Sequence, residues 1–151
     1  MTILNLDQRA AQYAQKMIEN GKAISEVSKP IDTVERLVTK TLGVLQEQGV
    51  YAMLLFLYSR TSDEGKVAPV IRNNLFRLLK DVSDQDGGDT SSCLPGFQDL
   101  AVPGDNADAQ TALKFYSDHA LGDLDRLLLV RELYEQTLIY ARYGAKAASS
   151  S

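Results

Sequence analysis

One stretch of this chain, Val50 to Tyr58, is almost unbroken apolar, and it limits what the rest of the chain can fold into. A segment without a polar face must be buried on most sides, so other elements have to pack around it. A short apolar run is compatible with a helix or with a central strand. Leucine, methionine and alanine dominate the run and β-branched residues are nearly absent, which favours a helix. The run is too short to span a bilayer, which needs about 20 apolar residues.

The length of 151 residues indicates one domain with a core of its own, which we expect to cover residues 1–148 before a disordered tail at 149–151. Cys93 is the single cysteine, so no internal disulfide can form, as is usual in a reducing cytosol. The first residues do not combine a basic segment with an apolar run, so we expect no signal peptide and a cytoplasmic protein without a membrane partner.

The charge of the chain restricts the kind of nucleic-acid binding that is plausible. The formal net charge is −4 and the isoelectric point is about 5.0. A free-standing nucleic-acid binder is usually basic, so this balance argues against one. It leaves room for a subunit that carries a local basic face inside a larger complex.

Apolar residues recur at helical spacing along most of the chain. The pattern predicts an all-α protein, a compact bundle of about six helices around a buried central helix at 50–60. Residues 61–66 are predicted as a turn, and the glycine- and proline-rich stretch 83–106 as a long irregular loop. The other predicted helices cover residues 7–20, 30–48, 67–82, 108–120 and 122–148.

No catalytic or metal-binding constellation emerges from the sequence. His119 is the only histidine, and no motif ties it to a serine or cysteine nucleophile. Tyr116 stands three residues before it, so the Glu-x-x-His pattern of a di-iron bundle is missing. The acidic stretch Asp81 to Asp89 departs from a calcium loop because Gly88 stands where the fifth position needs an acid, counting from Asp84. We therefore expect no enzyme, no cofactor and no metal.

The basic residues are more informative. Arg72, Phe76 and Lys80 follow one another at spacings of four and line one strip of a helix, with Asn73 and Arg77 beside it. The apolar stripe of that helix lies on the opposite side, so Phe76 is expected outside the main core. An aromatic ring between two cations suits a nucleic-acid strand. The alternative is that Phe76 packs on the long loop or on a partner subunit.

The centre of the chain runs Lys40-x-Leu42-x-x-Leu45, then Gly49-Val50, then Leu55-Phe56-Leu57-x-Ser59-Arg60. This pattern resembles the signature of the small all-helical subunit of the type III-B CRISPR effector, the Cmr complex. Two flanking segments are also similar to that family, Gln8-Arg9-Ala10-Ala11 and the cluster from Leu138 to Lys146. Gly43 departs from the family, which often has proline there, and Arg60 replaces a lysine and keeps the charge.

The resemblance implies a subunit without catalytic activity. Copies of it stack into the minor filament of the effector, beside the backbone subunits that carry the guide RNA, and help to hold the duplex of guide and target RNA. The alternatives are a helical adaptor that binds only protein, a small helical enzyme, and the related type III-A subunit. The residues expected to contact RNA are Lys40, Arg60, Arg72, Phe76, Lys80, Arg142 and Lys146.

Overall fold

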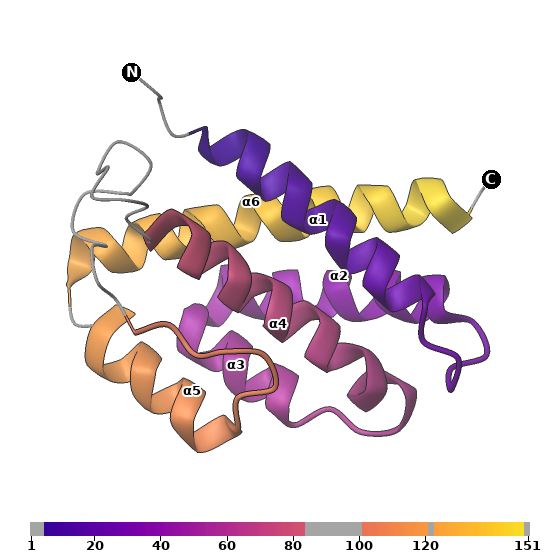
Figure 1. Cartoon of the computed structure of the whole chain (residues 1–151), viewed down its shortest axis with the longest axis horizontal. Coiled ribbons are helices and arrows are strands. Elements are labelled where there is room, and N and C mark those ends of the chain that lie inside the picture. Colours follow the sequence, from indigo (N-terminus) through magenta and orange to yellow (C-terminus); the bar gives the residue numbers. More distant parts are fainter. Residues whose placement is uncertain (1–4, 84–100, 121–122, 150–151) are drawn as a thin grey trace.

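The computed structural model describes residues 5–83, 101–120 and 123–149, and in these residues every regular element is a helix. The prediction of an all-α bundle is confirmed (Figure 1). The elements in chain order are α1 (Leu6–Lys22), α2 (Pro30–Gln48), α3 (Val50–Tyr58), α4 (Ser62–Ser83), α5 (Ala109–Phe115), the π-helix η2 (Tyr116–Ala120) and α6 (Leu124–Ser149).

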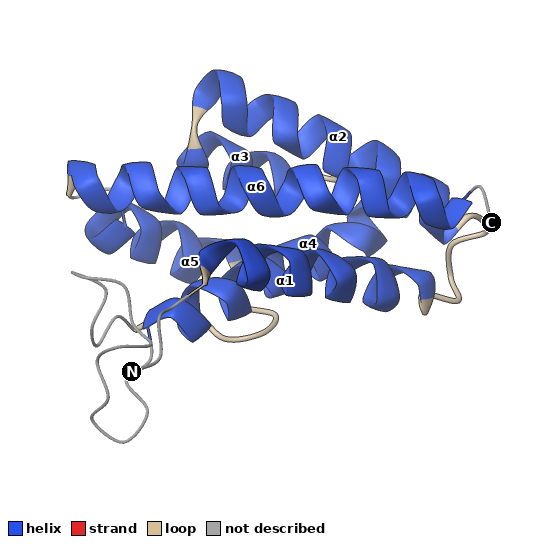
Figure 2. Ribbon diagram, turned by 90° about the horizontal axis from the view of Figure 1, so that it is seen from above, coloured by secondary structure: helices blue, strands red, loops and turns tan. Residues whose placement is uncertain are grey.

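The bundle is arranged along α6, its longest helix. Figure 2 shows α6 running the length of the molecule, with α2 and α3 on one side and α1 and α4 on the other. The apolar run forms α3, which packs against α2, α4, α5 and α6. Met53, Leu54 and Leu57 are buried in the core, whereas Tyr51 and Leu55 on the opposite side are 37% and 47% exposed. The central helix is therefore buried on most sides but keeps one apolar side at the surface.

Two residues with special backbone properties set the limits of α2. Pro30 is its first residue, where a missing N–H group costs nothing and the fixed φ suits a helix. Gly49 ends α2 with φ of +97°, a conformation that L side chains rarely adopt, and α3 starts at the next residue. The direction of the chain changes within this single glycine, so α3 folds back against α2.

The predicted turn at 61–66 is wrong over most of its length, because α4 already begins at Ser62. Asp63 and Glu64 occupy its first turn, where carboxylates interact favourably with the positive end of the helix dipole. Pro69, which a later start would have placed near the beginning of the helix, lies inside it. The helix is therefore longer at its N-terminal end than the apolar pattern alone indicates.

The other boundaries differ less. The predicted helix at 108–120 is divided, because α5 ends at Phe115 and the chain continues as the π-helix η2. Of the predicted loop at 83–106, Ser83 belongs to α4, residues 84–100 lie outside the described residues, and 101–106 contain no regular element. Ser149, expected in the tail, is the last residue of α6. The rest of that tail, residues 150 and 151, also lies outside the described residues.

Candidate nucleic-acid interface

Three cations converge on one carboxylate at the start of α4. We call this group, made of Arg36, Lys40, Arg60 and Glu64, the Glu64 cluster. The carboxylate accepts hydrogen bonds from Lys40 Nζ at 2.8 Å and Arg36 Nε at 3.1 Å, and Arg60 Nη1 lies 3.5 Å from its other oxygen. The side chain of Glu64 is 13% exposed, whereas those of Arg36 and Lys40 are about half exposed, at 51% and 48%. The cluster therefore has a net charge of +2 on the surface of the bundle.

Local structure explains why these residues meet. Arg36 and Lys40 are one helical turn apart on α2 and project from the same side. Arg60 follows α3 and reaches Glu64 across a tight turn. A Cβ atom on Gly65 would stand 2.9 Å from the carbonyl oxygen of Arg60, so the turn closes this far only with glycine. Ser62, in the same turn, has φ of +58°. The turn brings the end of α3 to the first turn of α4.

The electrostatics keep the Glu64 cluster assembled at neutral pH. The hydrogen bond from Lys40, followed by that from Arg36, lowers the pKa of Glu64 below its ordinary value, and this outweighs the opposing effect of partial burial. Glu64 is therefore ionised, and it orders long side chains that would otherwise repel one another. One carboxylate cannot neutralise three cations, so the ordered groups remain available to an anion.

Arg60 is also held from its other side. Its guanidinium lies over the ring of Phe56, 4.0 Å from the centroid, and its Nε donates to the carbonyl oxygen of Phe56 at 3.1 Å. The side chain remains 27% exposed. An apolar depression begins beside it on α2 and α3 and is lined by Val44, Gln48, Ala52, Leu55, Phe56 and Ser59.

The predicted strip on α4 does not form a surface for a nucleic-acid strand. Phe76 was expected outside the core, and this is wrong: it is 1% exposed, with the ring of Tyr116 6.1 Å away. Arg72 is partly buried, with its guanidinium over the ring of Tyr58 at 4.1 Å and its Nη1 3.4 Å from the carbonyl oxygen of Leu57. Only Lys80 is fully at the surface. The strip is interrupted at its centre, so Phe76 cannot stack on a base.

Asn73 and Arg77, beside that strip, hold the segment that precedes α5. Asn73 exchanges hydrogen bonds with Asn106, at 2.9 Å to its backbone N–H and 3.2 Å between the side chains. Arg77 binds Asp105 through two nitrogens, which lowers the pKa of that carboxyl. These contacts, named from now on the α4 anchor, attach the chain before α5 to the side of α4.

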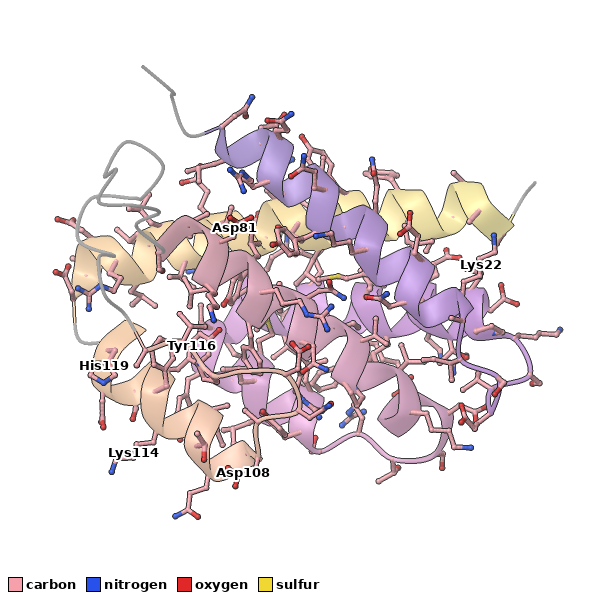
Figure 3. The ribbon with its side chains drawn as sticks, in the orientation of Figure 1. Lys22, Asp81, Asp108, Lys114, Tyr116 and His119 are labelled. Atoms are coloured by element: carbon pink, nitrogen blue, oxygen red, sulfur yellow. The ribbon has the colours of Figure 1, made fainter. Side chains whose placement is uncertain are left out.

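The charges around Lys80 largely offset one another. Its neighbour Asp81 accepts hydrogen bonds from Arg9 and from the hydroxyl of Tyr13 (Asp81 is labelled in Figure 3). Burial, together with the charge of Asp81, raises the pKa of Tyr13 to about 12. Because Asp81 balances Arg9, and Asp105 balances Arg77, this region carries little net positive charge.

The structure therefore brings together two of the seven predicted RNA contacts, Lys40 and Arg60. Arg142 and Lys146 are exposed on the last turns of α6, on a different element. Arg36 was not among the predicted contacts, although its spacing of four from Lys40 was a usable signal. Glu64 was missed because it lay in a predicted turn.

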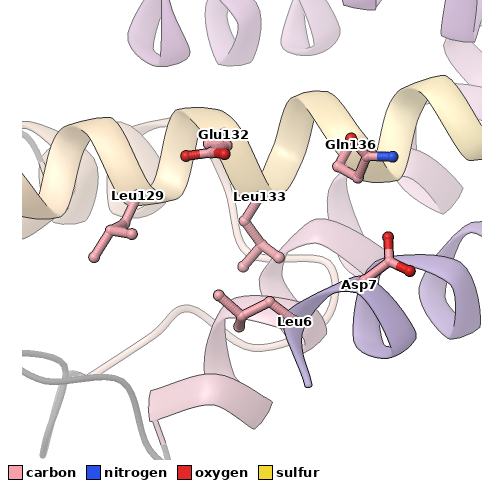
Figure 4. Close-up of a pocket in the computed structure, with 6 residues that line it drawn as sticks. All are labelled: Leu6, Asp7, Leu129, Glu132, Leu133 and Gln136. Carbon is pink, nitrogen blue, oxygen red and sulfur yellow. The ribbon is translucent and has the colours of Figure 1, made fainter. Parts of the chain in front are cut away.

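A second depression lies between the start of α1 and α6 (Figure 4). Its wall is partly apolar, and the Asp7 carboxylate on its rim accepts a hydrogen bond from the hydroxyl of Tyr140, which raises the pKa of that tyrosine. His119 is on another element, with its ring 5.5 Å from that of Phe115. The residues that line the depression are Leu6, Asp7, Leu129, Glu132, Leu133 and Gln136.

Comparison with known proteins gave no match among family models, curated proteins or solved structures. In the part of the chain that the structure describes, no helix combines the length and the apolar character needed to cross a membrane. The Glu64 cluster, which contains both basic residues of the central motif, is thus the feature from which a function has to be inferred.

Proposed function

We propose that this chain is a non-catalytic structural subunit of a cytoplasmic type III-B CRISPR effector, acting in antiviral defence. Copies of it would stack in the minor filament and help to hold the duplex of guide and target RNA. One observation carries the proposal. Lys40 and Arg60, the two basic residues of the motif that resembles the Cmr small subunit, are 20 positions apart in the sequence and contact the same carboxylate.

The Glu64 cluster has the properties that a phosphate contact requires. Its cations are ordered before the ligand arrives, which reduces the entropy lost on binding. Contacts of this kind neutralise phosphates and do not distinguish bases. A subunit that must accept any guide sequence needs contacts without base specificity. The rest of the chain is acidic, since the formal net charge is −4. RNA binding by this chain is therefore confined to the Glu64 cluster, and neighbouring subunits have to bring the RNA to it.

The test uses an effector assembled from this chain, the products of the neighbouring genes and a guide RNA. Replacing Lys40 and Arg60 by glutamine should weaken target-RNA binding by about tenfold and flatten the dependence of affinity on salt, because each lost phosphate contact removes about 0.7–0.9 from the slope. Lys114→Gln, which removes an exposed cation from α5 (Figure 3), is the matched control and should change neither quantity.

A variant of opposite sign makes the test sharper. Glu64→Gln removes the negative charge and keeps the shape, so the cluster gains one unit of positive charge. The dependence of RNA affinity on salt should become steeper, because Arg36, Lys40 and Arg60 are no longer partly neutralised. If the glutamine variants at Lys40 and Arg60 bind RNA as the unmodified chain does, the duplex is held by other groups and the proposal is wrong.

A second candidate function is a helical adaptor that binds only protein. Phe76 is buried and cannot serve as the contact that this alternative first suggested, but Leu55 and Tyr51 are exposed beside the apolar depression on α2 and α3. Leu55→Asp should then release the partner while leaving the chain folded. Isolation of the native assembly separates the two functions: RNA of guide length in it favours the effector subunit, and its absence favours the adaptor.

A further inference from the structure

The outer side of α6 carries a regular seam of surface residues. Seven positions recur at alternating spacings of three and four, which is the heptad spacing of helices that pair along their length. The two halves of the seam differ in charge: the first half is acidic and the second basic, with an apolar residue in each. The seven positions, called here the α6 seam, are Asp125, Leu128, Glu132, Glu135, Ile139, Arg142 and Lys146.

Asp125, Leu128, Glu132, Arg142 and Lys146 of this side are exposed, whereas Glu135 and Ile139 are half-buried and Ile139 packs against the core. α1 and α2 pack on α6, and of the elements that the structure describes Figure 2 shows none drawn over its outer side. Leu128 is 51% exposed, and Tyr143, one turn after Ile139, is 66% exposed. Leu124, at the start of the helix, is 67% exposed. Among the described residues, three of the five exposed large hydrophobic side chains thus belong to α6; the other two are on α3.

We propose that the α6 seam pairs with the same seam of a second copy of the chain in antiparallel orientation. A twofold axis between Glu135 and Gln136 places Asp125 opposite Lys146 of the second copy, and Leu128 opposite its Tyr143. Glu132 then meets Ile139, with Arg142 of the second copy within one turn. Asp125 and Glu132 then face the basic half of the other chain, and Leu128 meets an apolar residue, whereas Glu135 lies at the axis beside Glu135 of the second copy.

The charge pattern fixes the orientation. In a parallel pair, acids would face acids and cations would face cations along the whole seam, which is unfavourable. The antiparallel arrangement pairs unlike charges twice, because a twofold contact repeats each interaction. The paired length, residues 125 to 146, is about 33 Å at the rise of an α-helix. Only three apolar side chains per copy are buried along it, so the dimer is weak and forms reversibly.

This contact does not rest on the proposed function. It closes on itself as a pair, whereas stacking in a filament needs a head-to-tail contact. It also assigns Arg142 and Lys146, which the sequence analysis connected with RNA, to carboxylates of a second copy. RNA and the second copy would compete for this end of α6.

The isolated full chain is tested by analytical ultracentrifugation over a range of concentrations. We expect reversible dimerisation that weakens as salt is raised. Arg142→Glu with Lys146→Glu makes every charged position of the seam acidic, and Asp125→Lys with Glu132→Lys makes every charged position except Glu135 basic. Each variant alone should dimerise at least about tenfold less well than the unmodified chain. An equimolar mixture of the two should form a heterodimer, because both ends of the acidic seam then face cations of the basic one. Lys114→Glu, away from the seam, should leave the equilibrium unchanged.

The register has its own test. A cysteine at Gln136, with Cys93 replaced by serine, lies next to the proposed axis, so oxidation should link two copies in high yield, whereas a cysteine at Lys114 should not. A chain that stays monomeric at all concentrations overturns the proposal, and so does a mixture of the reversed variants that fails to associate. A third outcome also overturns the proposal. If the unmodified chain forms no dimer but binds duplex RNA, and the Arg142 and Lys146 variant loses this binding, the two cations contact RNA instead.

Discussion

The hydroxyl groups of Tyr116 and Tyr134 hydrogen-bond to each other inside the bundle, where neither side chain is exposed. The single hydrogen of the Tyr134 hydroxyl is donated to the carbonyl oxygen of Leu75 on α4, at 3.3 Å. Tyr116 is therefore the donor within the pair. The chain of hydrogen bonds connects η2, α6 and α4. Burial raises the pKa of both tyrosines above the ordinary value of 10.0, so both remain protonated at neutral pH.

The two tyrosines should respond unequally to loss of the hydroxyl. Tyr134→Phe leaves the Tyr116 hydroxyl buried without its acceptor, which should reduce the free energy of unfolding by about 1–3 kcal/mol. Tyr116→Phe leaves Tyr134 bound to Leu75 and should cost less. Urea unfolding of both variants and of the double variant measures the difference, and the double variant should cost less than the sum of the two. Equal and additive losses would contradict this order of donors.

Phe76 should act as a core residue and not as an RNA contact. Because its ring is buried beside Tyr116, Phe76→Ala should lower the free energy of unfolding by about 3–5 kcal/mol. Phe76→Leu should cost less and leave RNA binding by the effector unchanged. A Phe76→Leu variant of normal stability that loses RNA affinity would contradict the buried position.

The stabilising effect of Glu64 should depend on pH. Its pKa is lower in the folded chain than the ordinary 4.5, so its contribution is present above that value and is lost as the pH falls through the folded pKa. Glu64→Gln should reduce the free energy of unfolding at pH 7 by up to about 1 kcal/mol, a small effect because Arg36 and Lys40 are exposed to solvent. The difference between the two proteins should shrink toward zero in acid. Urea unfolding at several pH values measures it, and a difference that is constant with pH would rule out the charge as its cause.

Two glycines offer a matched comparison. Gly65→Ala would place a methyl group against the carbonyl of Arg60 and should destabilise the turn that assembles the Glu64 cluster. Gly43 lies inside α2, and a Cβ atom there would have nothing within 4 Å, so Gly43→Ala should stabilise the chain by about 0.5–1 kcal/mol. Thermal unfolding of both variants shows the opposite signs. Equal shifts would mean that the contact at Gly65 relaxes without cost.

The elements that local signals define could be predicted from the sequence. The limits of α2 and α3 follow from Pro30, Gly49 and the apolar run, each of which acts within a few residues. The start of α4 was placed too late because Gly65 suggests a turn. Two acids just before it are an equally local signal for a helix N-terminus, and they proved to be the better guide.

The candidate site was only partly predictable, since it depends on contacts between distant segments. The apolar stripe of α4 describes one buried side of that helix, but the ring of Tyr116 covers Phe76 on another side. Arg72 was predicted at the surface because its partner, the ring of Tyr58, comes from α3. Apolar periodicity within one helix identifies the side that faces the main core. It cannot show which other element covers the remaining sides of that helix.

The α4 anchor has a consequence for how the chain tolerates change. Asn73 and Arg77 fix Asn106 and Asp105 on α4, and the hydroxyl of Tyr58 donates to the carbonyl of Ala107 at 2.8 Å, just before α5. The approach to α5 is thereby fastened to the bundle independently of the sequence between Ser83 and Ala101. Insertions and deletions confined to that interval should accumulate among natural variants without displacing α5, which makes it the natural place to splice in a tag or a fluorescent reporter.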